Sequence, residues 1–235
     1  MKLLALETSA HVASVAIVDE TGLIGELTLH TEMTHSQKLM PAIESLMAQL
    51  DLKIADMDGI AVASGPGSFT GIRIGVATAK GLAHGSGLKV IPVSTLEALA
   101  WNLAGCPVRV CPIMDARRDQ VYTALFDCNA ETPNRIWEDQ ALSVSELSER
   151  LRADGIPVWF VGDGVKPHQK TLVEAMGPLA RFPGPHLQLQ SASALGMAAL
   201  GGSPESKMVT YSEAIPYYLR KAQAERTYDE RNQQR

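Results

Sequence analysis

The first hundred residues alternate short apolar runs with polar turns, a pattern typical of closely connected β-strands. Apolar runs at 2–6, 11–18 and 23–29 are separated by the polar segments Glu7–Ser9 and Asp19–Gly22. Three short runs joined by tight turns predict an antiparallel meander at the start of the chain.

Helical periodicity then appears between further strands. Helices are predicted at 38–50, 69–84 and 94–103, and strands at 59–64 and 89–93. Pro41 is tolerated if the first helix begins nearby, because a proline in the first turn loses no intrahelical hydrogen bond. Ser94 and Glu97 form a capping-box signature for the last helix. The first hundred residues therefore read βββαβαβα.

The strand pattern restarts after Gly105-Cys106-Pro107, which we interpret as a boundary. The predicted strands that follow are 108–114, 121–127, 135–142 and 158–161, and the predicted helices are 145–153, with Ser145 as its cap, 168–176 and 193–200. We expect two lobes, 1–105 and 106–216, of an α/β protein. A charged tail at 217–235 lacks a hydrophobic period, so we expect it to be extended or frayed.

Composition narrows the class of protein. The chain has 235 residues, 46% of them hydrophobic, and a formal net charge of −5. This apolar fraction excludes disorder as the main character, and no apolar run reaches the 18 or so residues of a membrane-spanning helix. The first apolar run ends at Glu7, too early for a secretory signal, so we expect a cytoplasmic protein. The net negative charge argues against binding of nucleic acid through the electrostatic field of the whole protein. A local basic patch that contacts nucleic acid stays possible.

A glycine-rich segment, Gly65-Pro66-Gly67-Ser68-Phe69-Thr70-Gly71, lies between a predicted strand and a predicted helix. It fits neither a Walker loop nor a dinucleotide fingerprint, because Ile72-Arg73 follows Gly71 and Thr70 replaces the third glycine. Its backbone N–H groups would suit an anion, and Glu7–Ser9 could contribute at the end of the first strand. The alternative is a tight turn without a ligand, and both interpretations stay open. The candidate phosphate-contacting residues are Thr8, Ser9, Gly65, Gly67, Ser68 and Gly71.

The helix after this loop carries a stripe of small residues, Gly71, Gly75, Ala79 and Ala83, which would admit a neighbouring backbone. We favour packing of this stripe within its own lobe and assign the larger residues to a partner. The two helices at 38–50 and 69–84 would pack against the equivalent pair of a paralogue or of a second copy and so form a four-helix interface. The candidate interface residues are Leu39, Ile43, Leu46, Met47, Ile72 and Val76.

Residues with metal-binding or nucleophilic chemistry form no recognisable local pattern. The six histidines show no HxxxH or HExxH spacing, and Cys106, Cys111 and Cys128 lack a CxxC pair. We therefore expect no protein-built metal site and three indifferent thiols. The charged cluster Asp115–Asp119 lies at a predicted hairpin turn, where it is either solvated or a docking surface.

Five segments resemble the TsaB (YeaZ) family. They are the opening LALETSA, DGIAVASGPGSFTGIRIGVATAKGLA at 58–83, VIPVSTLEALA at 90–100, MDARRDQVY at 114–122 and IPYYLR at 215–220. The resemblance implies the actin-like, sugar-kinase-like (ASKHA) fold with two βββαβα-type lobes. It further implies a non-catalytic subunit that pairs with its paralogue TsaD and acts with the ATPase TsaE. Their product would be N6-threonylcarbamoyladenosine (t6A), at the adenosine 3′ of the anticodon.

The resemblance also implies where the catalytic metal is missing. In TsaD an HMEGH motif follows the corresponding strand, and in this chain Thr95 and Leu99 stand at its two ligand positions. Neither residue can replace a histidine ligand, so we expect no bound zinc or iron. We expect no cofactor, with ATP or ADP bound at most weakly or at the complex interface, and a homodimer when the chain is isolated. tRNA would be reached through the complex, and whether the chain touches it directly stays open.

Two rival functions remain. Thr8, Ser9 and the glycine loop are compatible with an ASKHA-type nucleotide-binding ATPase or kinase-like enzyme. A glycoprotease-like peptidase is the second rival, and the missing HxxxH argues against it.

Overall fold

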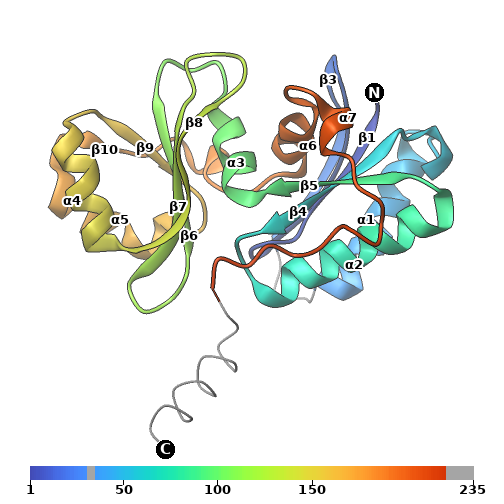
Figure 1. Ribbon diagram of the computed structural model, residues 1–235, viewed down its shortest axis with the longest axis horizontal. Coiled ribbons are helices and arrows are strands. Elements are labelled where there is room, and N and C mark those ends of the chain that lie inside the picture. Colours follow the sequence, from blue (N-terminus) through green and yellow to red (C-terminus); the bar gives the residue numbers. More distant parts are fainter. Residues whose placement is uncertain (31–34, 221–235) are drawn as a thin grey trace, which may run out of the picture.

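The computed structural model describes residues 1–30 and 35–220, which form two lobes, each built on one five-stranded sheet (Figure 1). The first sheet consists of β1 (Leu3–Glu7), β2 (Val12–Asp19), β3 (Gly22–His30), β4 (Gly59–Gly65) and β5 (Lys89–Ser94). The second consists of β6 (Arg109–Asp115), β7 (Gln120–Asp127), β8 (Asn134–Ser143), β9 (Val158–Val161) and β10 (Ala180–Arg181).

Both sheets have the same topology. The first runs β3-β2-β1-β4-β5, and the second, read from its opposite edge, runs β8-β7-β6-β9-β10. In each, three strands form an antiparallel meander, and the fourth and fifth add in parallel. The predicted meander and its restart are confirmed, and the α/β fold is the actin-like ASKHA architecture.

Helices cover both faces of the first sheet, and a pair of helices packs on one face of the second. The longer helices are α1 (His35–Gln49), α2 (Phe69–Ser86), α3 (Thr95–Ala100), α4 (Val144–Asp154), α5 (Val165–Met176), α6 (Ala192–Leu200) and α7 (Pro204–Lys207). Short 3₁₀ turns occur at Ile54–Asp56, Trp101–Leu103, Gly177–Leu179 and Pro185–Leu187. Helices α1 and α2 lie on one face of the first sheet, α6 lies on the other, and α3 joins the lobes (Figure 1). No helix in the described part of the chain has the length and apolarity needed to span a bilayer.

Helix starts agree with the sequence in part. Ser94 Oγ accepts a hydrogen bond from Glu97 N at 3.4 Å, as its capping role requires. The reciprocal half of the predicted capping box is wrong, because the Glu97 carboxylate instead lies 3.6 Å from Arg135. Ser145 is not the cap of α4: Ser143 Oγ accepts from Glu146 N at 3.1 Å, so the helix begins one residue earlier.

Pro41 lies inside α1 and not in its first turn. The helix already begins at His35, so Pro41 is its seventh residue. Its ring is exposed to solvent. The first-turn explanation for this proline is therefore wrong.

The chain returns to the first lobe after the second sheet. Helix α6 packs on β1 and β2, where Leu195 shares a core with Leu3. Residues 208–218, which we call the C-terminal strap, then run along the first lobe, with Val209 paired to Val90. The second lobe was thus predicted too long at its end, because residues from 192 onward cover the first sheet. Of the predicted tail, 221–235 lie outside the described residues.

Candidate functional site

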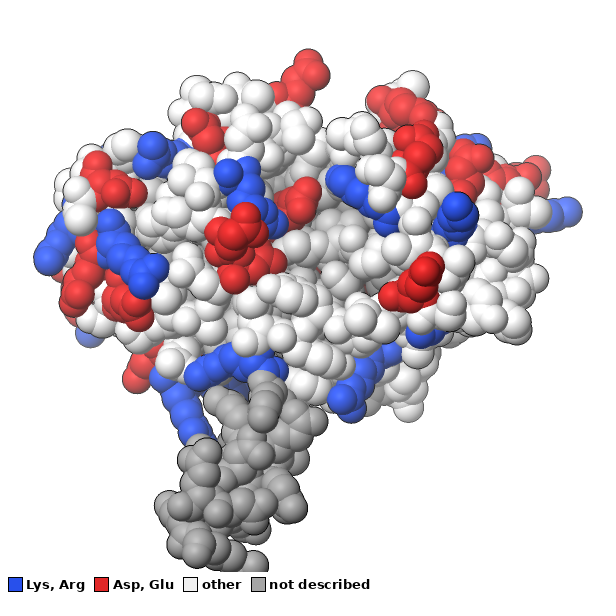
Figure 2. Space-filling model, in the orientation of Figure 1, with Lys and Arg blue, Asp and Glu red and all other residues white. Residues whose placement is uncertain are grey.

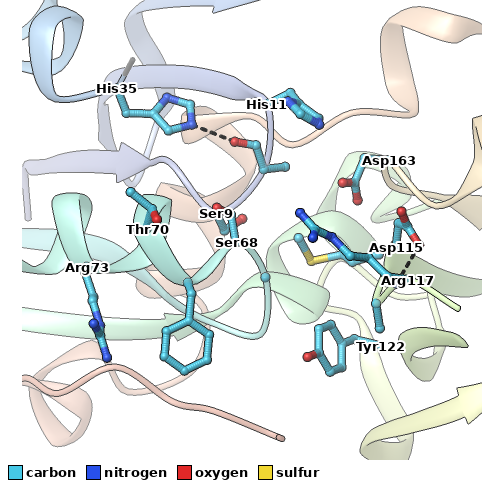
Figure 3. A pocket seen from close by; sticks show the side chains of 15 residues that line it. Ser9, His11, His35, Ser68, Thr70, Arg73, Asp115, Arg117, Tyr122 and Asp163 are labelled. Atoms are coloured by element: carbon cyan, nitrogen blue, oxygen red, sulfur yellow. Dashed lines mark hydrogen bonds between the residues drawn. The ribbon is translucent and has the colours of Figure 1, made fainter. Parts of the chain in front are cut away.

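A pocket of about 580 Å³ lies between the two lobes (Figure 3). Its lining residues are Ser9, Ala10, His11, His35, Gly67, Ser68, Phe69, Thr70, Arg73, Met114, Asp115, Ala116, Arg117, Tyr122 and Asp163. His35 is the first residue of α1, and Tyr122 lies in β7. The others come from the ends of β1 and β6, the loop after β4 with the first turns of α2, and the loop after β9. These are the carboxyl ends of strands, where ligands of α/β proteins commonly bind.

The first-lobe wall is closed by hydrogen bonds between the end of β1 and the start of α2. Ser68 N donates to Ser9 O at 2.7 Å, and Thr8 Oγ1 donates to Gly71 O at 2.8 Å. Ser68 Oγ in turn accepts from Gly71 N at 3.3 Å and caps the helix. The loop is therefore held in shape by the protein itself.

The glycines of this loop are needed for close backbone approach. A Cβ on Gly71 would collide with Thr8 O, and one on Gly67 would collide with Ser9 O. Gly65 has φ of +125° and lies against the carbonyl of Tyr217 in the strap, which likewise leaves no space for a side chain. These contacts explain the glycine pattern without a ligand.

The candidate phosphate-contacting residues divide into two groups. Ser9, Gly67 and Ser68 line the pocket, whereas Thr8, Gly65 and Gly71 are buried behind its wall. Ser9 Oγ is fully buried and has no hydrogen-bond partner among the described residues. A ligand in the pocket could satisfy this hydroxyl.

Two buried acidic residues lie near the pocket floor. Glu7 Oε1 accepts from Ser9 N at 2.6 Å, while Glu7 Oε2 has no partner in the described chain. Burial raises the pKa of Glu7 to about 7, although the hydrogen bond from Ser9 N opposes the rise. Burial also raises the pKa of Asp163, against a hydrogen bond from Gln190.

Asp163 is a pocket residue that no motif in the sequence indicated. Gly162-Asp163-Gly164 follows β9 as the glycine loop follows β4, and the two strands hold equivalent places in their sheets. Because the loops after these two strands are equivalent, the duplicated strand pattern could have indicated that Asp163 lies at the pocket.

The second-lobe wall is the hairpin between β6 and β7, as the cluster Asp115–Asp119 predicts. Its tip has positive φ at Arg117 (63°), Arg118 (55°) and Asp119 (55°), and Arg117 N donates to Asp115 Oδ1 at 2.8 Å. The Arg117 side chain extends across the pocket toward Ser9 and Ser68 (Figure 3). His168 Nε2 lies 3.7 Å from Asp115 Oδ1 behind the hairpin.

An aromatic cluster that the sequence did not indicate forms the edge of the pocket near α2. The rings of Phe69 and Tyr218 stack with centroids 4.1 Å apart. The Arg73 guanidinium lies 4.9 Å from the Phe69 centroid, and Arg73 Nε donates to Tyr218 Oη at 3.0 Å. The cluster joins the first turn of α2 to the strap, 145 residues away in sequence.

The candidate interface residues lie inside the lobe, which corrects their assignment. Five of them are buried in one core with residues of β1, β2 and β4: Leu39, Ile43, Leu46, Ile72 and Val76. Met47 is partly buried against the same core. The small stripe of α2 also faces inward, as predicted, since a Cβ on Gly75 would collide with Thr8 Oγ1.

The metal-ligand positions of the paralogue fall on a buried helix. Thr95 and Leu99 lie in α3, with exposures of 0% and 1%. Within residues 1–30 and 35–220, no group of three or more His, Cys, Asp and Glu side chains could hold a metal ion. Cys111 and Cys128 are buried, and burial raises the pKa of each thiol to about 12, so neither is a nucleophile at neutral pH.

Known proteins resemble this chain over most of its length. The family model for TsaD, described as tRNA N6-adenosine threonylcarbamoyltransferase, matches residues 21–228. The tRNA threonylcarbamoyladenosine biosynthesis protein TsaB of Bacillus subtilis is 35% identical over 96% of each chain. TsaB of Escherichia coli is 34% identical over 60% of each. The solved structure of YeaZ from Pseudomonas aeruginosa is 28% identical, with a TM-score of 0.78 over 93% of this chain and 99% of that one.

The match to the Bacillus relative spans nearly the whole of both chains. The same two-lobed structure recurs in the Pseudomonas protein. This chain belongs to the TsaB (YeaZ) family.

Proposed function

We propose that the chain takes part in t6A biosynthesis as a scaffold and activating subunit that pairs with TsaD and acts with TsaE. The observation that carries this proposal is the full-length match to a TsaB protein named for that pathway. Threonylcarbamoyl transfer to tRNA would be catalysed by TsaD, and this chain would hold TsaD in its active conformation.

The proposed non-catalytic role is supported by the chemistry at α3. A threonine hydroxyl and a leucine side chain, at Thr95 and Leu99, cannot supply the two histidine ligands of the paralogue. Leu99 instead packs in a hydrophobic core with residues of β6 and β7, and Thr95 is fully buried. A chain of this kind contributes to the reaction by binding and not through its own metal.

The surface proposed for pairing is the outward side of α1 and α2. It carries Met40, 38% exposed, and Ala77, also exposed, next to the half-buried Met47 and Ile74. Apolar side chains on an exposed helix pair favour association because pairing removes them from water. The same surface would pair two copies of this chain, so a homodimer would compete with the TsaD complex.

Co-purification tests the pairing. Met40→Glu and Ala77→Glu should each prevent tagged TsaD from retaining this chain, because pairing would bury an unpaired charge. Val173→Glu is the matched control, since Val173 is an exposed apolar residue (46%) on α5 in the other lobe. Retention of all three variants alike would contradict the proposed surface.

We propose that free nucleotide binds the isolated chain weakly or not at all. The Thr8 and Ser68 hydroxyls already hydrogen-bond within the pocket wall, and of these three residues only Ser9 has a hydroxyl without a described partner. Fewer groups are therefore available to phosphates than in an open loop. Titration calorimetry with ATP should give no dissociation constant below about 1 μM, which corresponds to roughly −8 kcal/mol. Tighter binding would favour the rival ATPase or kinase-like function.

A further inference from the structure

Arginine side chains stand around the rim of the interlobe pocket, although the chain as a whole is acidic. Arg73 on α2 and Arg117 on the β6–β7 hairpin both line the pocket, Arg118 is next to Arg117, and Arg220 follows the strap. None of these four forms an ion pair with another described residue, while the formal net charge of the chain is −5. Lys and Arg side chains of both lobes gather along the lower edge in Figure 2, where Asp and Glu are sparse.

Aromatic rings stand beside these arginines. Tyr218 stacks on Phe69, with Arg73 over both rings, and the half-buried Tyr122 lines the opposite wall. Interleaved arginines and aromatic rings are the usual means of binding single-stranded nucleic acid, in which guanidinium groups contact phosphates and bases stack on rings.

The acidic floor distinguishes this pocket from one built for a free polyphosphate. Asp163 lines the floor, with Glu7 buried behind it, and the exposed Asp115 lines the hairpin wall. Carboxylates repel phosphate groups but accept hydrogen bonds from the amino groups of bases. Charge therefore places phosphates at the rim and leaves the interior for a base.

We propose that this rim binds an unpaired segment of tRNA directly. Arg73, Arg117 and Arg118 contact its phosphates, and a base stacks on the Phe69–Tyr218 pair or enters the pocket. The inference rests on the proposed function, because the tRNA anticodon loop that carries the modified adenosine is single-stranded. It assigns to this chain a contact that would otherwise fall to TsaD alone.

The test is a binding measurement with the reconstituted complex of this chain and TsaD. The probe is a fluorescently labelled, unmodified tRNA that reads codons beginning with adenosine. Anisotropy is recorded between 50 and 200 mM salt for Arg117→Gln/Arg118→Gln. The matched control is Arg152→Gln/Arg181→Gln, two exposed arginines that do not line the pocket.

The hairpin variant should bind the tRNA about tenfold more weakly, and the slope of log affinity against log salt should fall by about 1.4, since each single-strand phosphate contact contributes about 0.7. The control should stay within about twofold of the parent. Tyr218→Leu should weaken binding about 5- to 100-fold through lost stacking, whereas Tyr218→Phe, which keeps the ring, should bind like the parent.

Three results would overturn the proposal. In the first, both arginine variants bind tRNA equally well. In the second, the hairpin variant loses TsaD but the affinity of the remaining complex for tRNA is unchanged, which identifies the rim as a protein-binding surface. In the third, ATP displaces the tRNA at micromolar concentration, which identifies a free-nucleotide site. If the hairpin variant binds tRNA as the parent does while t6A formation still requires this chain, the contact between the rim and tRNA is refuted. The proposed function then still stands.

Discussion

Glu7 shows how a single buried residue couples the fold to pH. Its carboxyl group is fully buried at the end of β1, with one oxygen bonded to Ser9 N and the other without a described partner. Because burial disfavours the charged form, its folded-state pKa rises from 4.5 to about 7. The folded state therefore holds this proton more tightly than the unfolded state does.

The sign of the pH effect follows from that shift. A raised folded-state pKa contributes stability that is complete below about pH 4.5 and is lost as pH rises through about 7. The full loss is of the order of 3 kcal/mol at alkaline pH. Glu7→Gln, which stays neutral, should unfold at a higher urea concentration than the parent at pH 8 and at a similar one at pH 5.

Chemical denaturation at pH 5, 6.5 and 8 checks this prediction. Glu149→Gln on the exposed side of α4 is the control and should leave the pH profile unchanged. A parent protein whose unfolding free energy does not fall between pH 5 and 8 would contradict the burial of an ionisable Glu7.

At the residue scale, the sequence predicted groups that are close in the chain and missed those joined by the fold. Ser94 and the Asp115–Asp119 turn are local features, since a cap or a hairpin is decided within a few residues. Asp163 lines the pocket only because the two lobes meet, and Tyr218 stacks on the pocket residue Phe69 only because the chain returns. No spacing along the sequence carries that information.

Among the elements, α2 is the most constrained because it is enclosed on several sides. It packs against β4 and contacts α1, and the strap bonds to Arg73 and Lys80. This coverage explains why its larger apolar residues were wrongly assigned to a partner. The strap buries Ala214 against the same core, and no helix or strand predicted from the sequence marked this segment.

Alanine substitutions at two of the glycines of α2, Gly75 and Gly81, should change the stability of the protein in opposite directions. A Cβ at Gly75 meets Thr8 Oγ1, so Gly75→Ala should destabilise the protein by about 1–3 kcal/mol. A Cβ at Gly81 meets nothing within 4 Å, so Gly81→Ala should stabilise it by up to about 1 kcal/mol through helix propensity. Urea denaturation measures both. Equal effects would mean that the small stripe of α2 does not face β1.

Val76 tests which side of α2 faces the core. Its exposure is 3%, so Val76→Asp should place an unpaired charge in the core and destabilise the lobe by about 3 kcal/mol or more. Circular dichroism should show a lowered melting temperature or an unfolded chain. A variant that keeps the parent's melting temperature but no longer binds TsaD would instead restore Val76 to the partner interface.

The whole molecule is a duplication of one topology with the C-terminal segment folded back onto the first lobe. The strand order could be predicted because short turns force neighbouring strands to pair and longer helical crossovers make them parallel. The return of α6 could not, because a mainly apolar helix fits either sheet equally well. Its place beside β1 and β2 is set by tertiary packing, in which Gly196 allows close approach to Val18.

A reconstituted assay with single omissions tests the proposal that this chain supports t6A formation without catalysing it. This chain, TsaD, TsaE, the threonylcarbamoyl donor, ATP and unmodified tRNA are combined, and t6A is measured by mass spectrometry of digested tRNA. The complete mixture should form t6A. Omission of this chain should abolish it, and this chain without TsaD should form none. Undiminished t6A in the absence of this chain, or t6A formed by this chain without TsaD, would contradict the account.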